Sequence, residues 1–248
     1  MMTMKRIKLT VAYDGTHYCG WQIQKNGITI EQVLNETLSD FFKQDIKVIG
    51  ASRTDSGVHA LGNVAVLDAD VTMPPEKIAY AINNLLPDDI RIQRSEEVAS
   101  DFHPRYCDTR KTYEYKIYNA QFPDPIVRLY SHFVYYHLDE EKMQQGADYL
   151  VGEHDFKSFC TPSDDVENTV RTIYYIKVIR EGNMVRILVN GNGFLYNMVR
   201  IIVGSLLKVG MGMIEPSEIG NILEAKDRTK AGHKAAACGL TLVNIEYM

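Results

Sequence analysis

The chain has 248 residues, of which 45% are hydrophobic and 24% are charged, and this ordinary globular composition excludes a disordered or fibrous protein. Its formal net charge is −5, so any site for nucleic acid must be a local basic patch rather than a basic molecule. The four cysteines, Cys19, Cys107, Cys160 and Cys238, lie far apart, which indicates neither a zinc site nor a disulfide framework and favours a cytoplasmic protein.

The sequence also argues against membrane association. Residues 1–8 carry charges where a signal peptide needs an apolar core, and no segment reaches about 18 apolar residues without a charge. The longest apolar stretch, residues 194–209, is interrupted by Asn197, Arg200 and Lys208. We therefore expect this stretch to be a buried helix and the protein to be soluble.

The first half of the chain contains both the period-two pattern of strands and the three-and-four spacing of helices. Thr29 and Gln32 form a capping-box pattern ahead of one helix, and two prolines precede the other. The expected elements are a strand over 7–11 ending at a turn over 13–16, a helix over 30–42, strands over 46–49 and 64–67, and a helix over 75–86 that Pro87 stops.

The second half continues the mixture of strands and helices. The expected elements are strands over 113–117 and 133–136, a helix over 143–150, strands over 173–179 and 185–189 around a turn, the helix in 194–209, and a strand over 240–247. These elements predict an α+β fold of two related α/β subdomains, residues 1–105 and 106–248, with mainly antiparallel sheets joined into one extended sheet. We expect helices to cover one face.

Residues 51–60, Ala-Ser-Arg-Thr-Asp-Ser-Gly-Val-His-Ala, place one carboxylate, Asp55, in a polar loop between two strand-like runs. The guanidinium of Arg53 would hold a nearby carboxylate ionised and oriented, as a nucleophilic aspartate requires. The alternative is that Asp55 caps a turn and Arg53 is a surface charge. The residues alone leave both interpretations open.

Basic and aromatic residues are interleaved in residues 105–118, which include Arg105, Arg110, Lys111 and Lys116 together with Tyr106, Tyr113, Tyr115 and Tyr118. A second candidate is the run 182–214, which has cations and no acidic residue. Phosphates attract cations and unstacked bases attract aromatic faces, so both runs are candidate RNA-binding patches. The alternative is a mixed solvated surface with strand tyrosines that face a core.

Residues 51–60 resemble the signature of the TruA family of tRNA pseudouridine synthases. Four other blocks in the same order resemble that family too: residues 13–24, 101–103, 111–115 and 194–200, with Gly239-Leu240 near the end. The chain departs from the family pattern at Ser52, where glycine is usual, and at His233 and Ala236, where prolines are common. The resemblance covers nearly the whole chain.

The resemblance implies a role for five residues. Asp55, in the first subdomain, corresponds to the catalytic nucleophile. Arg53 corresponds to a residue of the segment that helps to displace the target base from the RNA stack. Tyr113 corresponds to the tyrosine that packs against that base, Arg200 to the arginine that pairs with the catalytic carboxylate, and Leu240 to the apolar lining of the uracil pocket. The residues alone pair Asp55 with Arg53, but we prefer Arg200, because a neighbour two places along the chain often points away.

The resemblance further implies that the protein converts uridine to pseudouridine in the anticodon stem-loop of tRNA, at positions 38, 39 and 40. The reaction needs no cofactor and no metal. A homodimer is expected to embrace the tRNA, with the active-site cleft between the subdomains. Two alternatives remain: an RNA-binding module without catalysis, and a pseudouridine synthase that acts on ribosomal RNA.

Overall fold

The computed structural model describes residues 3–162 and 168–248. Contacts divide the chain into two compact units: Met1–Asp108 with Leu242–Met248, and Thr109–Thr241. The expected segments 1–105 and 106–248 differ from this division at their boundary and in the last residues. The C-terminal residues belong to the first unit because the Tyr247 ring packs edge-on against Phe102, with ring centroids 5.1 Å apart.

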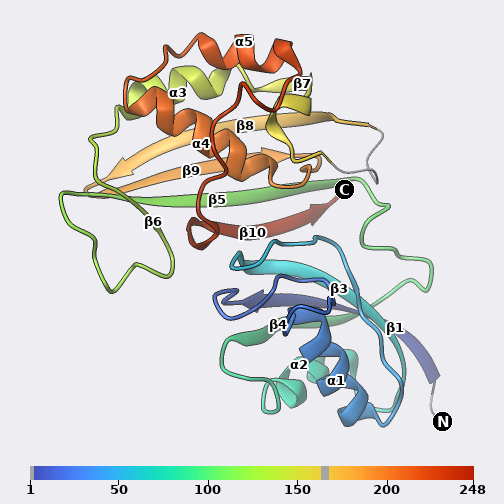
Figure 1. Ribbon diagram of the computed structural model, residues 1–248. Helices are drawn as coiled ribbons and strands as arrows, with labels where there is room; N and C mark the ends of the chain where they lie inside the picture. The colour runs from blue at the N-terminus through green and yellow to red at the C-terminus, as the bar shows by residue number, and fades with distance from the viewer. Residues whose placement is uncertain (1–2, 163–167) are drawn as a thin grey trace. The chain divides into compact units, whose positions relative to one another are not determined.

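The first unit is a sheet with two helices. Its elements are β1 (Thr3–Tyr13), α1 (Ile30–Phe42), β2 (Ile49–Gly50), β3 (His59–Val71), α2 (Pro75–Ile82), β4 (Ile90–Val98) and most of β10 (Leu240–Tyr247). The strands are ordered β4-β1-β3-β10, and β2 pairs with β3. The pairs of β1 with β3 and β4 are antiparallel. Figure 1 shows α1 and α2 on the same face of this sheet, and the two helices contact each other.

The start of α1 confirms the expected N-terminal cap. The hydroxyl of Thr29 accepts a hydrogen bond from the backbone N–H of Gln32 at 3.3 Å. The side chain of Gln32 binds Glu36 one turn later instead of reaching back to Thr29. Only half of the reciprocal capping box is therefore formed.

Two elements of the first unit are shorter than the sequence predicts. Of the expected strand 46–49 only Ile49 pairs with β3, because the N–H of Val48 bonds to the side chain of Asn35 on α1. Helix α2 ends at Ile82 and not at Leu86, the residue before Pro87. The side chain of Asn83 bonds to both backbone groups of Ile92, which fixes the turn there.

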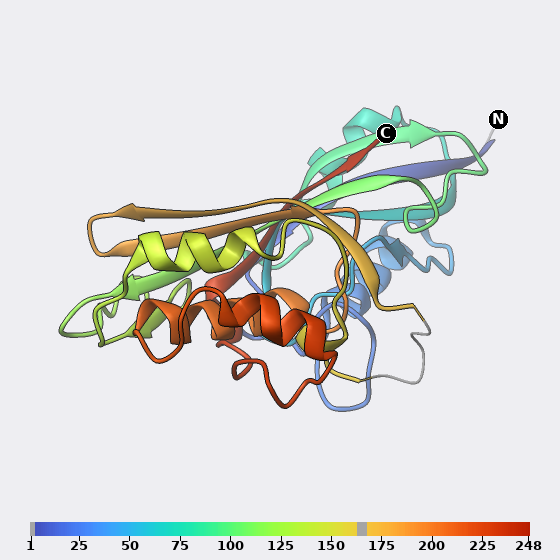
Figure 2. The same ribbon diagram turned by 90° about the horizontal axis from the view of Figure 1, so that it is seen from above.

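Within its described residues, the second unit is a sheet that carries three α-helices. Its elements are β5 (Thr109–Asn119), β6 (His132–Val134), α3 (Glu140–Asp148), β7 (Gly152–Asp155), β8 (Val170–Glu181), β9 (Met184–Gly191), α4 (Met198–Gly210) and α5 (Glu218–Ala225). The strand order is β5-β9-β8-β7, with β6 parallel to β5 and the other pairs antiparallel. Figure 2 shows α3, α4 and α5 on one side of these strands.

The expected α+β fold with mainly antiparallel sheets and helices on one face is confirmed. Strand β10 spans Leu240–Tyr247, as predicted. The expected strand 133–136 ends at Val134, because the amide of Asn119 donates to the carbonyls of Val134 and Tyr136 in place of a further strand ladder. Helix α4 begins at Met198, after Asn197 turns the chain with a φ of 61°.

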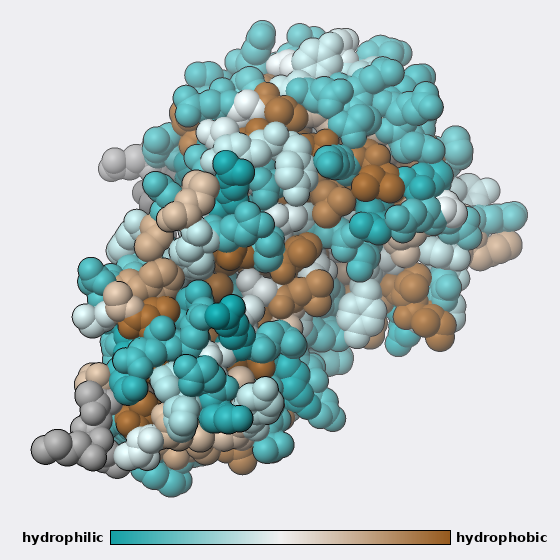
Figure 3. Space-filling view, turned by 180° about the vertical axis from the view of Figure 1, so that it is seen from behind, coloured by the Kyte–Doolittle hydropathy of each residue, from teal (hydrophilic) through white to brown (hydrophobic). Residues whose placement is uncertain are grey.

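The surface drawn in Figure 3 is mainly hydrophilic, with separate groups of apolar residues between the polar ones. Among the residues that the structure describes, no helix is both long enough and apolar enough to cross a membrane.

Candidate active site

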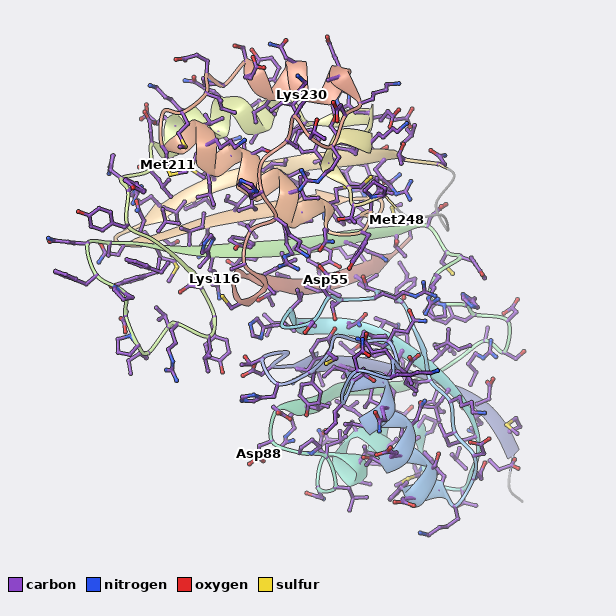
Figure 4. All side chains as sticks on the ribbon, viewed as in Figure 1. Asp55, Asp88, Lys116, Met211, Lys230 and Met248 are labelled. Carbon is purple, nitrogen blue, oxygen red and sulfur yellow. The ribbon has the colours of Figure 1, made fainter. Side chains whose placement is uncertain are left out.

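Asp55 lies on the loop between β2 and β3, where Figure 4 labels it. Its side chain is half-buried, whereas Arg53 is exposed and Thr54 is buried. The Thr54 hydroxyl oxygen lies 2.8 Å from the Tyr13 hydroxyl oxygen, and the Thr54 carbonyl accepts from the backbone N–H of Trp21 at 3.1 Å. The residue next to Asp55 is thus held through its side chain and its backbone.

Further hydrogen bonds hold the rest of this loop. The Asn63 amide donates to the Tyr13 hydroxyl at 3.3 Å and to the Ser52 carbonyl at 3.0 Å. The hydroxyl of Ser56 donates to the carbonyl of Tyr18 at 3.2 Å. Asn63 is fully buried, and buried hydrogen bonds of this kind are costly to leave unmade. They restrict the positions that the Asp55 backbone can adopt.

The segment over 13–24 packs backbone to backbone against the Asp55 loop at two glycines. Gly20 has a φ of 86°, and a Cβ atom there would lie 2.6 Å from the Thr54 carbonyl oxygen. A Cβ atom at Gly15 would lie 2.0 Å from the Val58 carbonyl oxygen. Only glycine permits such a close approach. Two motifs that are separate in the sequence therefore form one structure, which we call the Asp55 clamp: residues 13–24 packed on residues 51–58.

Tyr113 and Arg200 lie in the second unit. Tyr113, on β5, is buried and packs edge-on against Phe194, with ring centroids 5.2 Å apart. Arg200 is only 8% exposed. From the first turn of α4, its Nε donates to the Ala235 carbonyl at 2.8 Å and its Nη1 to the Asn197 side-chain oxygen at 3.4 Å. Two neutral oxygens thus orient a buried guanidinium.

Leu240 follows a segment that is packed against β5. The Tyr115 hydroxyl donates to the Ala236 carbonyl at 2.8 Å, and a Cβ atom at Gly239 would lie 2.7 Å from the Tyr115 ring. Burial raises the pKa of Tyr115, against the opposing charge of Arg200, so Tyr115 stays a neutral donor. Leu240 is buried where β10 begins.

The same segment crosses α4 at a second pair of glycines. A Cβ atom at Gly204 would lie 1.7 Å from the His233 carbonyl oxygen, and one at Gly232 would lie 2.4 Å from the backbone of Gly204. We call this contact the α4 crossing. It uses the backbone of His233, which explains why a residue other than the family's proline is accommodated there.

The candidate residues thus fall into two groups by unit. Asp55 and Arg53 belong to the first unit, and Tyr113, Arg200 and Leu240 belong to the second. Within the described parts of the chain, no group of three or more His, Cys, Asp or Glu residues is arranged to hold a metal ion.

Sequence reasoning missed the residues that support this site. It assigned no role to Thr54 or Asn63, whose hydrogen bonds hold the Asp55 loop. It treated Tyr115 as part of a candidate RNA-binding patch or as a core tyrosine, whereas the buried Tyr115 holds the segment before Leu240. Two glycines inside the motif over 13–24, Gly15 and Gly20, were the available signal, because a glycine in a motif often marks a close approach of backbone.

Comparison with known proteins identifies the family. The family model described as tRNA pseudouridine synthase matches residues 9–107 and 147–248. The tRNA pseudouridine synthase A of Ruminiclostridium cellulolyticum is 51% identical over 245 residues, which are 98% of this chain and 100% of that protein. The corresponding protein of Acetivibrio thermocellus is 45% identical over 244 residues, with 98% and 100% covered. The chain belongs to the tRNA pseudouridine synthase family.

Likeness to solved structures is weak by comparison. A chain in the crystal structure of a Cbf5-Nop10-Gar1 complex superposes with a TM-score of 0.38 at 15% identity, over 94% of this chain and 47% of that chain. A TM-score this low does not support a conclusion about the present protein.

Membership in the tRNA pseudouridine synthase family confirms the predicted resemblance and the prediction that the protein is an isomerase. The residues matched by the family model include Asp55, Arg53, Arg200 and Leu240, whereas Tyr113 lies between the two matched segments. The individual roles of these residues stay predictions.

Proposed function

We propose that this tRNA pseudouridine synthase isomerises uridines in the anticodon stem-loop of tRNA, with Asp55 as the nucleophile. The observation that carries the proposal is the Asp55 clamp: the loop is held by buried hydrogen bonds on Thr54, while Asp55 itself stays half-buried. A carboxylate that is both fixed and accessible suits attack on a bound nucleoside.

The proposed reaction breaks the bond between uracil N1 and ribose C1′ and forms one between C5 and C1′. The proton on C5 is lost and N1 gains a proton, so the product is an isomer and no cofactor, metal or redox partner is required. The Asp55 carboxylate would add to uracil C6 or act at the ribose, by attacking C1′ or removing the C2′ proton. Each route needs an ionised aspartate beside an extruded base.

We assign supporting roles to residues of the second unit. Arg200 would pair with the Asp55 carboxylate, because Arg200 is only 8% exposed and a buried guanidinium needs an anion. Tyr113 would pack against the uracil, and Leu240 would line its pocket. These contacts would offset the few kcal/mol that unstacking a base costs.

The tRNA substrate, a homodimer and a cytoplasmic location complete the proposal. The relatives are named tRNA pseudouridine synthase A, and an acidic chain with a net charge of −5 would bind tRNA through local basic patches in a salt-dependent way. Arg53 would help to displace the target base.

The experiment is a tritium-release assay. tRNA labelled with [5-³H]uridine is incubated with the wild-type protein and with Asp55→Asn, which keeps the shape of the side chain and removes its charge. We expect the variant to release tritium about 10⁴-fold more slowly or not at all, since removal of a catalytic group typically costs this much. Its affinity for tRNA should stay close to that of the wild type.

Asp40→Asn, on α1, is the matched control and should release tritium at the wild-type rate. Normal release by Asp55→Asn would disprove the assignment of the nucleophile. Failure of the wild-type protein to release tritium from tRNA, with release from ribosomal RNA, would favour the alternative substrate.

A further inference from the structure

We propose that Arg53, Arg105 and Tyr106 form an RNA-binding surface on the first unit, in which the two guanidinium groups hold a backbone phosphate and the Tyr106 ring stacks on an unpaired base. The inference deepens the proposed function, on which it rests. It adds a binding role for Arg105 and Tyr106 and a phosphate contact for Arg53. We call these three residues the arginine–tyrosine surface.

Arg105 is anchored beside the Asp55 loop. Its Nε donates to the carbonyl of Gly50 at 2.6 Å, and Gly50 is the residue directly before that loop. This bond uses one edge of the guanidinium and leaves its terminal nitrogens for another acceptor. Neither Arg105 nor Arg53 forms a salt bridge with a carboxylate of the described residues.

Arg105 lies near the chain segment of Arg53, because it bonds to the carbonyl of Gly50, three residues before Arg53. Burial lowers the pKa of Arg105, and the positive charge of Arg53 lowers it further, while Glu31 and Tyr106 act in the opposite direction. Glu31 is engaged elsewhere, since its carboxylate accepts from the backbone N–H of Ile23 at 2.9 Å. Two neighbouring like charges are unfavourable unless an anion lies near both. A phosphate has the charge and the acceptor geometry for two guanidinium groups.

Tyr106 provides an aromatic face next to these charges. Its ring stacks on His103 with centroids 4.1 Å apart and ring planes 21° apart, yet Tyr106 is 86% exposed. The His103 ring is itself fixed, because its Nδ1 accepts from the backbone N–H of Arg105 at 3.2 Å. One face of Tyr106 is therefore supported and the other is open to solvent.

A supported aromatic ring beside paired cations is the arrangement that binds single-stranded or extruded nucleotides. The location favours RNA near the target uridine, because Arg53 is two residues from Asp55 and Arg105 bonds to the start of the same loop. The arginine–tyrosine surface would then hold the nucleotide that flanks the extruded base and orient the substrate.

The test measures the affinity for an unmodified tRNA transcript, in the Asp55→Asn background so that no turnover occurs. We expect Tyr106→Ala to raise Kd about ten-fold, within the range for loss of one base stack, and Tyr106→Phe, which keeps the ring, to bind like its parent. Because both arginines hold one phosphate, we expect the double variant Arg53→Gln/Arg105→Gln to reduce the slope of log Kd against log salt by about 0.7 to 0.9, the value for one phosphate contact. Each single variant should reduce the slope by part of that amount.

Tyr80→Ala is the matched control, because Tyr80 is also exposed, at 72%, and also belongs to the first unit. It should leave Kd unchanged. An unchanged Kd in Tyr106→Ala, or an equal loss in Tyr80→Ala, would overturn the stacking role. Unchanged salt slopes in both arginine variants would overturn the phosphate site.

These outcomes are independent of the catalytic assignment. A failure of the proposed function appears as normal tritium release by Asp55→Asn, whereas a failure of this inference appears only in Kd and its salt dependence. Thermal unfolding of each variant shows whether an affinity loss comes from unfolding, and Arg53→Gln, at an exposed position, keeps the test valid if Arg105→Gln does not fold.

Discussion

The Asp55 clamp of the first unit and the α4 crossing of the second differ in how they hold their candidate residues. Both bring backbone segments that are distant in the chain into direct contact at glycines, Gly20 on the Thr54 carbonyl and Gly204 on the His233 carbonyl. In the clamp, the candidate nucleophile is half-buried and its neighbour Thr54 is held by a buried hydrogen bond. At the crossing, the candidate residue Arg200 is itself buried in a helix.

This difference predicts at which residues the effect of a substitution on the reaction can be separated from its effect on folding stability. A half-buried side chain on a held loop can change without leaving a cavity, so substitutions at Asp55 should affect the reaction more than folding. A buried charge in a helix contributes to both, because its removal also leaves its partners without a donor. The first unit should therefore tolerate changes in the candidate nucleophile Asp55 better than the second unit tolerates changes in Arg200.

After Asp55→Asn, the largest expected effect is that of Arg200→Met. If Arg200 pairs with the Asp55 carboxylate as proposed, the single-turnover rate of pseudouridine formation should fall about 10³-fold, as on removal of one electrostatic stabilising group, with tRNA affinity largely retained. Loss of a buried charged partner should also lower the free energy of unfolding by about 3–5 kcal/mol. Arg180→Met is the control, since Arg180 also bonds inside the second unit, to Glu140 at 2.8 Å, and carries no proposed role. A destabilised Arg200→Met with a normal rate would make Arg200 a structural residue.

The next largest expected effect is that of Gly204→Ala, and it concerns the free energy of unfolding. The added Cβ atom would lie 1.7 Å from the backbone oxygen of His233, so α4 or the segment that crosses it must shift, and we expect a loss of about 3 kcal/mol in the free energy of unfolding. Urea titration gives this value.

The control for that prediction is Gly220→Ala, also in a helix, where the new Cβ atom would first meet the half-exposed ring of Tyr149 at 3.0 Å. It should be neutral or slightly stabilising, because alanine favours a helix more than glycine does. Equal stability of Gly204→Ala and the wild type would mean that the crossing can relax.

The smallest expected effect is that of Thr54→Val, which removes the hydroxyl from the Asp55 clamp at nearly constant volume. The lost bond to Tyr13 should cost about 1 kcal/mol of unfolding free energy. The rate should fall several-fold as well, because small displacements of a catalytic group are costly.

Tyr18→Phe is its control, since that tyrosine belongs to the same segment but its hydroxyl donates to Asp89 at 2.6 Å, away from the loop. It should lower stability by a similar amount and leave the rate unchanged. If both variants slow the reaction equally, the clamp does not position Asp55.

Local pattern was enough to predict most elements of the fold. Alternation and spacing predicted β1, α1, β5 and β10, with the bounds of β10 correct, because each is stabilised mainly by an apolar face of its own. Elements that end through a hydrogen bond to a distant segment were predicted too long. Asn83, directly after α2, bonds to Ile92 on β4, and Asn119 on β5 bonds to the end of β6. No local pattern contains that information.

The sequence by itself was enough to identify the family and the candidate residues, and to show which of them lie in the first and second halves of the chain. This is because the residues proposed to take part in the reaction lie in short motifs. Only the tertiary structure decided that the motifs over 13–24 and 51–58 are one clamp, and that Tyr106 is exposed and stacked on His103. The physical reason is that these contacts join backbones and rings far apart in sequence or at a turn, where neither hydropathy nor spacing records which atoms meet.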